Sequence, residues 1–188
     1  MLTLYDAPRC PYCARVRIAL AEKRVPHETV VVDLANRPGW IYEKNATGRV
    51  PVLEEGEWLL PESEVILEYL EERYPEPALL PADAGDRAAV RLAVHRFDGN
   101  LGDAYYAFRR GEDGAPERLA ECLAALDKAA ADWPYGYGIA DVAYAPWLMR
   151  LRDLLDFDLA PYPALVARLD ALAERPAVAA EIAVVAQL

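Results

Sequence analysis

The chain has 188 residues, of which 54% are hydrophobic and 27% charged, and its formal net charge at pH 7 is −11. This acidity argues against a nucleic-acid partner and against an anionic membrane surface. No apolar run approaches the roughly 18 residues that a membrane span needs, and the N-terminal sequence lacks the basic and apolar regions of a signal peptide. Three cysteines, an odd number, do not make a disulfide framework. We therefore expect a soluble protein of a reducing, cytoplasmic compartment.

The first 75 residues alternate strand and helix patterns. Strands are expected at Leu2–Tyr5, Thr29–Val32, Val50–Glu54 and Glu57–Leu60, and helices at Pro11–Lys23 and Glu62–Tyr74. The last two strands are expected to form a hairpin. Residues 34–44 are expected to contain a loop and an irregular helix. The order β-α-β-(α)-β-β-α is that of a thioredoxin-like domain, whose parallel first half requires a right-handed crossover helix.

The rest of the chain has helix patterns and no strand-like segment. The proline-rich stretch Pro75–Pro81 is typical of an interdomain linker. Helices are expected at Asp86–Arg110, Pro116–Trp133, Ile139–Leu155, Pro163–Arg175 and Ala177–Ala186. The sequence thus predicts an α/β thioredoxin-like domain over residues 1–75, a linker over 76–84 and an all-α bundle over 85–188.

The sequence Cys10-Pro11-Tyr12-Cys13 stands between the first predicted strand and the first predicted helix. A C-x-x-C in this setting is typical of a thioredoxin-like redox site. A cysteine at a helix N-terminus faces free backbone N–H groups and the positive end of the helix dipole. Its thiolate, the nucleophile of disulfide exchange, is therefore stabilised. Cys10 is the candidate nucleophile, and Cys13 is either a resolving thiol or a half-buried helix residue.

Other interpretations of the two cysteines are weaker. A structural zinc site needs four ligands, usually two such pairs, and the remaining Cys122, His27 and His95 have no ligand-like spacing. We therefore expect no metal. A disulfide across a three-residue step inside a helix would be strained, and two incidental buried thiols would not explain the position at a helix start.

Beyond the cysteine motif, the whole chain resembles the glutathione transferase superfamily. The most specific matches are residues 45–53, Asn-Ala-Thr-Gly-Arg-Val-Pro-Val-Leu, and residues 61–66, Pro-Glu-Ser-Glu-Val-Ile. Residues 34–40 match the omega-like transferases best, whereas the complete Cys-Pro-Tyr-Cys matches the two-domain glutaredoxins. Both branches use an active-site cysteine. The resemblance implies thiol–disulfide exchange with glutathione as co-substrate.

The resemblance also implies which residues bind glutathione. Val50 would pair its backbone with the cysteinyl unit, as in strand addition, and Pro51 would follow a cis peptide bond. Glu62 would bind the ammonium group of the γ-glutamyl unit. The hydroxyl of Ser63 and the N–H groups of the helix start would bind its carboxylate, although Ser63 could also be an ordinary N-cap.

A basic residue is expected for the glycyl carboxylate of glutathione. The omega-like transferases carry one at the position of Arg37, although a solvated surface arginine explains this residue about as well, and Lys44 is a weaker candidate. Tyr12 is expected beside the reactive thiol, and Leu34 along the same site.

The chain departs from the family pattern at residue 138. The family usually has Ser or Thr three residues before an aspartate at the start of a central helix, and here Gly138 precedes Asp141. Glycine as an N-cap costs only roughly a few tenths of a kcal/mol relative to serine. The departure therefore concerns the strength of the cap and not the chemistry.

The leading hypothesis is a glutathione-dependent thiol transferase that reduces mixed disulfides through Cys10. Conjugation of an electrophile, reductive dehalogenation and reduction of dehydroascorbate are alternatives on the same site. A non-catalytic binding or regulatory protein of the same fold is the alternative from another class. The sequence leaves open the natural co-substrate, the use of another low-molecular-weight thiol, and the choice between monomer and homodimer.

Overall fold

The computed structural model describes residues 1–188, and its first half is built on a four-stranded mixed sheet. The strands are β1 (Leu2–Asp6), β2 (Glu28–Val31), β3 (Val52–Glu55) and β4 (Trp58–Pro61), in the order β2-β1-β3-β4. β1 runs parallel to β2 and antiparallel to β3, which pairs antiparallel with β4. This is the thioredoxin-like domain that the sequence predicts.

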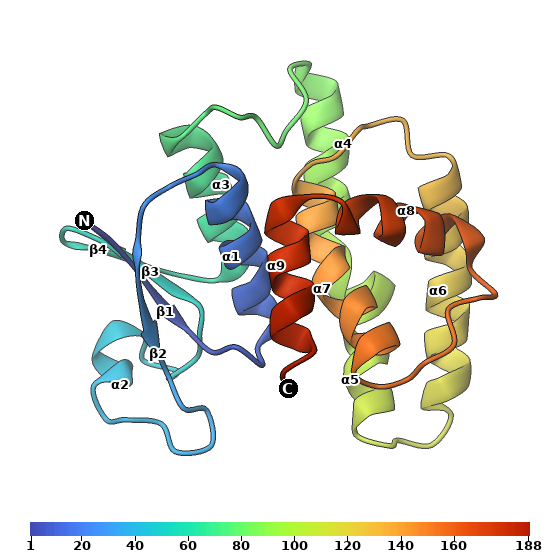
Figure 1. The fold of residues 1–188 in the computed structure, drawn as a ribbon, viewed down its shortest axis with the longest axis horizontal. Helices are drawn as coiled ribbons and strands as arrows, with labels where there is room; N and C mark the ends of the chain where they lie inside the picture. The colour runs from blue at the N-terminus through green and yellow to red at the C-terminus, as the bar shows by residue number, and fades with distance from the viewer.

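Three helices accompany the sheet: α1 (Pro11–Glu22), α2 (Ile41–Lys44) and α3 (Ser63–Arg73). In Figure 1, α1 and α3 lie between the sheet and the helical half, whereas α2 lies on the other side of the sheet. Most of α1 is buried, because it is covered on both sides. This explains why its sequence shows no clear polar face.

The second half is entirely helical, as predicted. Its elements are α4 (Ala84–His95), the π-helical segment η1 (Asp98–Gly102), α5 (Asp103–Arg109), α6 (Ala115–Ala131), α7 (Ile139–Asp153), α8 (Pro163–Ala173) and α9 (Pro176–Val185). α7 is buried along most of its length. None of the helices is both long and apolar enough to cross a membrane.

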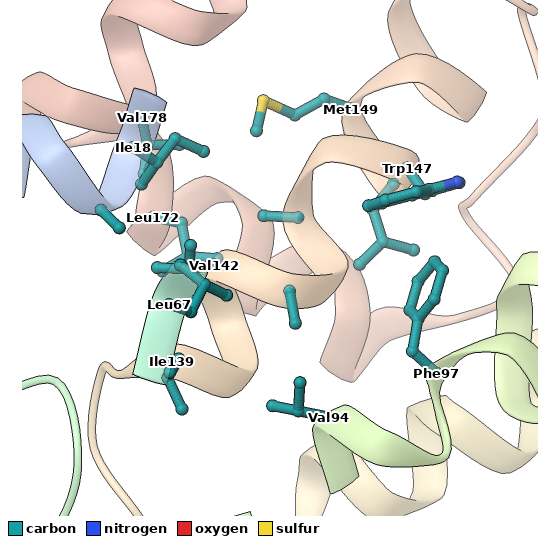
Figure 2. Close-up of a cluster of buried hydrophobic side chains, with 14 of the residues drawn as sticks. Ile18, Leu67, Val94, Phe97, Ile139, Val142, Trp147, Met149, Leu172 and Val178 are labelled. Carbon is teal, nitrogen blue, oxygen red and sulfur yellow. The ribbon is translucent and has the colours of Figure 1, made fainter. Parts of the chain in front are cut away.

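One continuous apolar core joins the two halves. Figure 2 shows Ile18 of α1 and Leu67 of α3 meeting Val142 of α7 and Val178 of α9, all of them buried. A polar contact adds to this junction. The buried carboxylate of Glu181 in α9 accepts hydrogen bonds from Arg17 of α1 at 2.9 Å and from Arg150 of α7 at 3.0 Å. The helix that begins at Cys10 is thus fixed by both halves.

The expected helix Asp86–Arg110 is wrong in its extent, and the cause is local. α4 begins earlier, at Ala84, because the carboxylate of Asp83 accepts the N–H groups of Gly85 and Asp86 at 2.8 and 3.1 Å. The wider turn of η1 then separates α4 from α5. A Cβ atom at Gly102 would lie 2.8 Å from the ring of Phe97, so this close approach requires glycine.

Smaller differences concern the strands. β2 begins and ends one residue earlier than expected, and β3 begins at Val52, two residues later than expected. Val50 and Pro51, which are joined by a cis peptide bond, precede the strand. Between β2 and β3, only Ile41–Lys44 is helical. The predicted hairpin is present, with Gly56 at a φ of 61° in its turn. The domain boundaries at 75 and 85 stay a prediction.

Candidate active site

Cys10 lies at the junction of β1 and α1, directly before the first helical residue. Its backbone is extended, with φ −81° and ψ 116°, in the N-cap position. Its half-buried side chain places Sγ 3.7 Å from the carbonyl oxygen of Val50. The candidate nucleophile therefore sits between the start of α1 and the loop that leads into β3.

The Cys13 side chain lowers the pKa of Cys10. A hydrogen bond between the two side chains is the largest cause that lowers the pKa of Cys10, from 9.0 to about 7. Burial opposes this shift, and the backbone N–H groups of Cys13 and Tyr12 support it. Burial raises the pKa of Cys13 well above its ordinary value. Cys13 thus stays a thiol that donates, while about half of Cys10 is ionised at neutral pH.

A polar cleft of about 600 Å³ opens beside this cysteine pair. Its walls are Tyr12 and Arg15 of α1, residues 45 and 49–51 of the loop before β3, residues 62–65 at the start of α3, and Asp98 of η1. The peptide bond between Val50 and Pro51 is cis, as the family resemblance implies. Cys10 adjoins the cleft through Val50.

The structure gathers most of the predicted binding residues at this cleft, but not all of them. Tyr12, Val50, Pro51, Glu62 and Ser63 line it.

The other predicted binding residues lie elsewhere. Leu34 packs against the small apolar cluster that contains Val50 and Cys13 and that Cys10 also contacts. Arg37 is exposed and does not line the cleft. Lys44 is paired with Glu54 at 2.7 Å, so its charge is already neutralised.

The start of α3 corrects the interpretation of Ser63 as an N-cap. Glu62 is the N-cap, exposed and at a φ of 69°, and Ser63 is the first helical residue. The buried Ser63 Oγ accepts a hydrogen bond from Arg15 Nη1 at 3.3 Å. The first N–H groups of a helix have no intrahelical partners, and here they lie at the wall of the cleft. An anion can therefore be bound at this point.

Sequence reasoning missed three charged residues of the cleft. Arg49 belongs to the motif of residues 45–53, and its exposed side chain borders the cleft. Arg15 lies between apolar residues of a buried helix, and a charged residue in such a position is the signal that could have identified it. Asp98 accepts a hydrogen bond from the Tyr12 hydroxyl at 3.3 Å. This contact joins α1 to η1, and no local sequence pattern could have indicated it.

Aromatic rings line the helical side of the cysteine pair. Tyr106 of α5 lies nearly parallel to Tyr12, with ring centroids 6.3 Å apart, and Trp147 of α7 meets Tyr12 edge-on at 4.7 Å. Burial raises the pKa of Tyr106 to about 12, and the nearby charge of Cys10 contributes to the same shift. Trp147 is fully buried in the core, whereas the half-buried Tyr106 lies close to the nucleophile.

Comparison with known proteins identifies the family. Residues 4–78 match the family model described as glutathione S-transferase, N-terminal domain. The chain is 32% identical to pyrimidodiazepine synthase of Drosophila melanogaster, over 96% of this chain and 80% of that protein. It is also 32% identical to glutathione S-transferase omega-1 of Rattus norvegicus, over 81% of this chain and 68% of that protein. A stringent starvation protein A homolog of Pasteurella multocida is 32% identical over 93% of this chain and 87% of that protein.

The fold agrees with these sequence relationships. Glutathione transferase Omega 3C from Trametes versicolor superposes with a TM-score of 0.82 at 29% identity, over 96% of this chain and 83% of that one. Glutathione is the co-substrate of this family. The chain belongs to the glutathione transferase superfamily and is omega-like.

Proposed function

We propose that the protein is a glutathione-dependent thiol transferase with Cys10 as its nucleophile. The observation that carries this proposal is the position of Cys10, at the N-cap of α1 and beside the polar cleft, where the neighbouring Cys13 side chain lowers its pKa to about 7. A thiol with a pKa near the ambient pH is the best attacking group in thiol–disulfide exchange, because it combines a large thiolate fraction with high nucleophilicity. Reaction in a reducing, cytoplasmic compartment fits this chemistry.

The reaction takes place in two exchange steps. The Cys10 thiolate attacks the glutathione sulfur of a mixed disulfide, forms a Cys10–glutathione disulfide and releases the reduced substrate as a thiolate. The thiolate of a second glutathione then attacks the glutathione sulfur bound to Cys10. Oxidised glutathione leaves and the Cys10 thiolate is restored. In this scheme Cys13 donates a hydrogen bond to the Cys10 thiolate and forms no disulfide of its own; the dithiol route is the alternative.

The cleft supplies a partner for each polar group of glutathione. The backbone of Val50 pairs with the cysteinyl unit, and the carboxylate of Glu62 binds the γ-glutamyl ammonium group. Ser63 and the N-terminus of α3 bind the γ-glutamyl carboxylate. For the glycyl carboxylate we assign Arg49 in place of Arg37, because Arg49 borders the cleft.

The test is turnover of the glutathione–hydroxyethyl mixed disulfide in a coupled assay. We expect the wild type to be active and Cys10→Ser to be inactive. Cys122→Ser is the matched control, because Cys122 lies in α6 of the helical half, and it should retain full activity. A wild type without turnover would refute the proposal. Turnover of electrophiles that survives Cys10→Ser would favour conjugation instead.

A non-catalytic binding role is the second candidate. It is favoured by the stringent starvation protein A homolog, whose name describes no transfer reaction and which matches 93% of this chain. Such a role would not require an ionised Cys10. Alkylation of Cys10 by iodoacetamide discriminates between the two: reaction with a midpoint near pH 7 supports the enzyme, and no thiolate below pH 8.5 supports the binding protein.

A further inference from the structure

Arg15 is a buried cation at the wall of the cleft. Only 1% of its surface is exposed. Its guanidinium lies 4.2 Å from the ring centroid of Phe97, 4.5 Å from that of Trp147 and 5.2 Å from that of Tyr12. Three rings around one guanidinium hold it in a single orientation, and each favours the charged form. The position of this charge is therefore fixed by both halves of the protein.

The polar contacts of this guanidinium are incomplete. Nε donates to the carbonyl oxygen of Ala143 at 3.0 Å, and Nη1 donates to Ser63 Oγ at 3.3 Å. Nη2 is buried without a partner. The nearest carboxylate, Glu64, lies 3.7 Å away and has 41% of its side chain exposed. Burial lowers the pKa of Arg15 and raises that of Glu64, so the charge of the pair is poorly compensated.

The other charges around the cleft restrict where an anion can bind. Glu62, Glu64 and Asp98 are acidic, and Arg15 and Arg49 are the basic residues of the wall. These three carboxylates repel an anion from most of the cleft. The exception is the start of α3, at Ser63. There the free N–H groups of the helix start lie at the wall of the cleft, and the buried Arg15 contacts Ser63 beside them.

We propose that Arg15 is a positioning residue that makes the cleft select thiols with a carboxylate beside an ammonium group. Because Nη1 donates to the oxygen of Ser63, the hydroxyl proton of Ser63 is directed into the cleft, where it is donated to the carboxylate. The buried charge lies behind this hydroxyl and strengthens its attraction for an anion. This inference rests on the proposed glutathione site, but it concerns binding and not turnover.

The experiment compares two ligands that cannot undergo disulfide exchange. S-methylglutathione carries the α-carboxylate, and its analogue with a 4-aminobutanoyl unit in place of the γ-glutamyl unit lacks only that group. Dissociation constants are measured by isothermal titration calorimetry. We expect the wild type to prefer S-methylglutathione by roughly 10- to 100-fold, the range for a hydrogen bond to a charged group.

In Arg15→Gln this preference should fall to less than about threefold, because S-methylglutathione binds more weakly while the analogue binds as before. Arg15→Lys keeps the charge without the fork of donors and should give an intermediate preference. Ser63→Ala should reduce the preference in the same way. Arg17→Gln is the matched control, since Arg17 lies in the same helix but pairs with Glu181 and Asp6 outside the cleft. Its preference should be that of the wild type.

A merely structural role for Arg15 predicts a different result, in which both ligands lose affinity equally in Arg15→Gln. That outcome, or a wild type that binds both ligands equally well, would overturn the inference and leave the thiol transferase proposal standing. A wild type that binds neither ligand would overturn both. Where Arg15→Gln does not fold, by circular dichroism, the comparison of Arg15→Lys and Ser63→Ala decides the question.

Discussion

Replacing Cys13 by alanine should raise the pKa of Cys10. The pKa difference of about 2 between the ordinary 9.0 and the value of about 7 corresponds to about 3 kcal/mol. The Cys13 hydrogen bond is its largest favourable cause, and a hydrogen bond to a charged group contributes about 1.5–3 kcal/mol. We therefore expect Cys13→Ala to raise the pKa of Cys10 to roughly 8–9.

The effect on the rate is smaller than the effect on ionisation. At pH 7 the thiolate fraction should fall from about one half to roughly 1–10%, as a pKa of 8–9 implies. The more basic thiolate is also more nucleophilic, with a Brønsted coefficient of about 0.4–0.5, so the rate constant of the thiolate itself rises roughly fivefold. The rate at pH 7 should thus drop only a few-fold, while the midpoint of the pH profile moves upward.

The assay is the rate of alkylation by iodoacetamide against pH, in a Cys122→Ser background so that only the motif reacts. Cys13→Ser keeps a hydroxyl donor and should shift the midpoint less than Cys13→Ala does. Cys13→Ser also separates the two possible roles of Cys13. A dithiol enzyme would lose protein-disulfide reduction and retain deglutathionylation. A midpoint in Cys13→Ala within about 0.3 of the wild-type value would show that the hydrogen bond does not control the acidity of Cys10.

Three further predictions concern other residues. Arg49→Ala should raise KM for glutathione roughly two- to fivefold, as for an exposed ion pair, and should leave KM for γ-glutamylcysteine unchanged, because that thiol lacks the glycyl carboxylate. Arg37→Ala should change neither KM value, and the opposite pattern would return the glycyl carboxylate to Arg37. Gly138→Ser should lower the free energy of unfolding in urea by roughly 1–3 kcal/mol, because a Cβ atom there would lie 2.5 Å from the carbonyl oxygen of Leu79; an increase in stability would contradict this packing. Trp147→Ala should cost about 3–5 kcal/mol in the same assay, since the ring is fully buried, and a loss below about 1 kcal/mol would contradict its place in the core.

Local sequence patterns were sufficient to predict the order of the elements and the position of the cysteine motif at the start of a helix. Cys10 and Cys13 are three residues apart, so the helix that they begin brings them together without help from the rest of the fold. The strand and helix periods likewise depend on neighbouring residues. For this reason the mixed sheet and the helical second half agree with the sequence pattern.

Contacts between distant residues could not be predicted in the same way. The partners of Arg15 are Ser63 and Ala143, which lie 48 and 128 residues away in the sequence. The choice between Arg37 and Arg49 depends on the path of a loop, which no periodicity describes. The break before α5 depends on a ring that packs against Gly102, and a helix pattern does not record such a contact.

The attachment of α1 to the helical half limits how this protein can be recombined with its relatives. Arg17 of α1 donates a hydrogen bond to Glu181 of α9, the last helix of the chain. Ile18 of α1 packs in the same apolar core as Val178 of α9. A chimera that joins residues 1–80 to the helices of another family member would replace Glu181 and the apolar side chains of the second half that share a core with Ile18. We therefore expect exchanges of α9 to disturb the helix that begins at Cys10, although 171 positions separate Cys10 from Glu181 in the sequence.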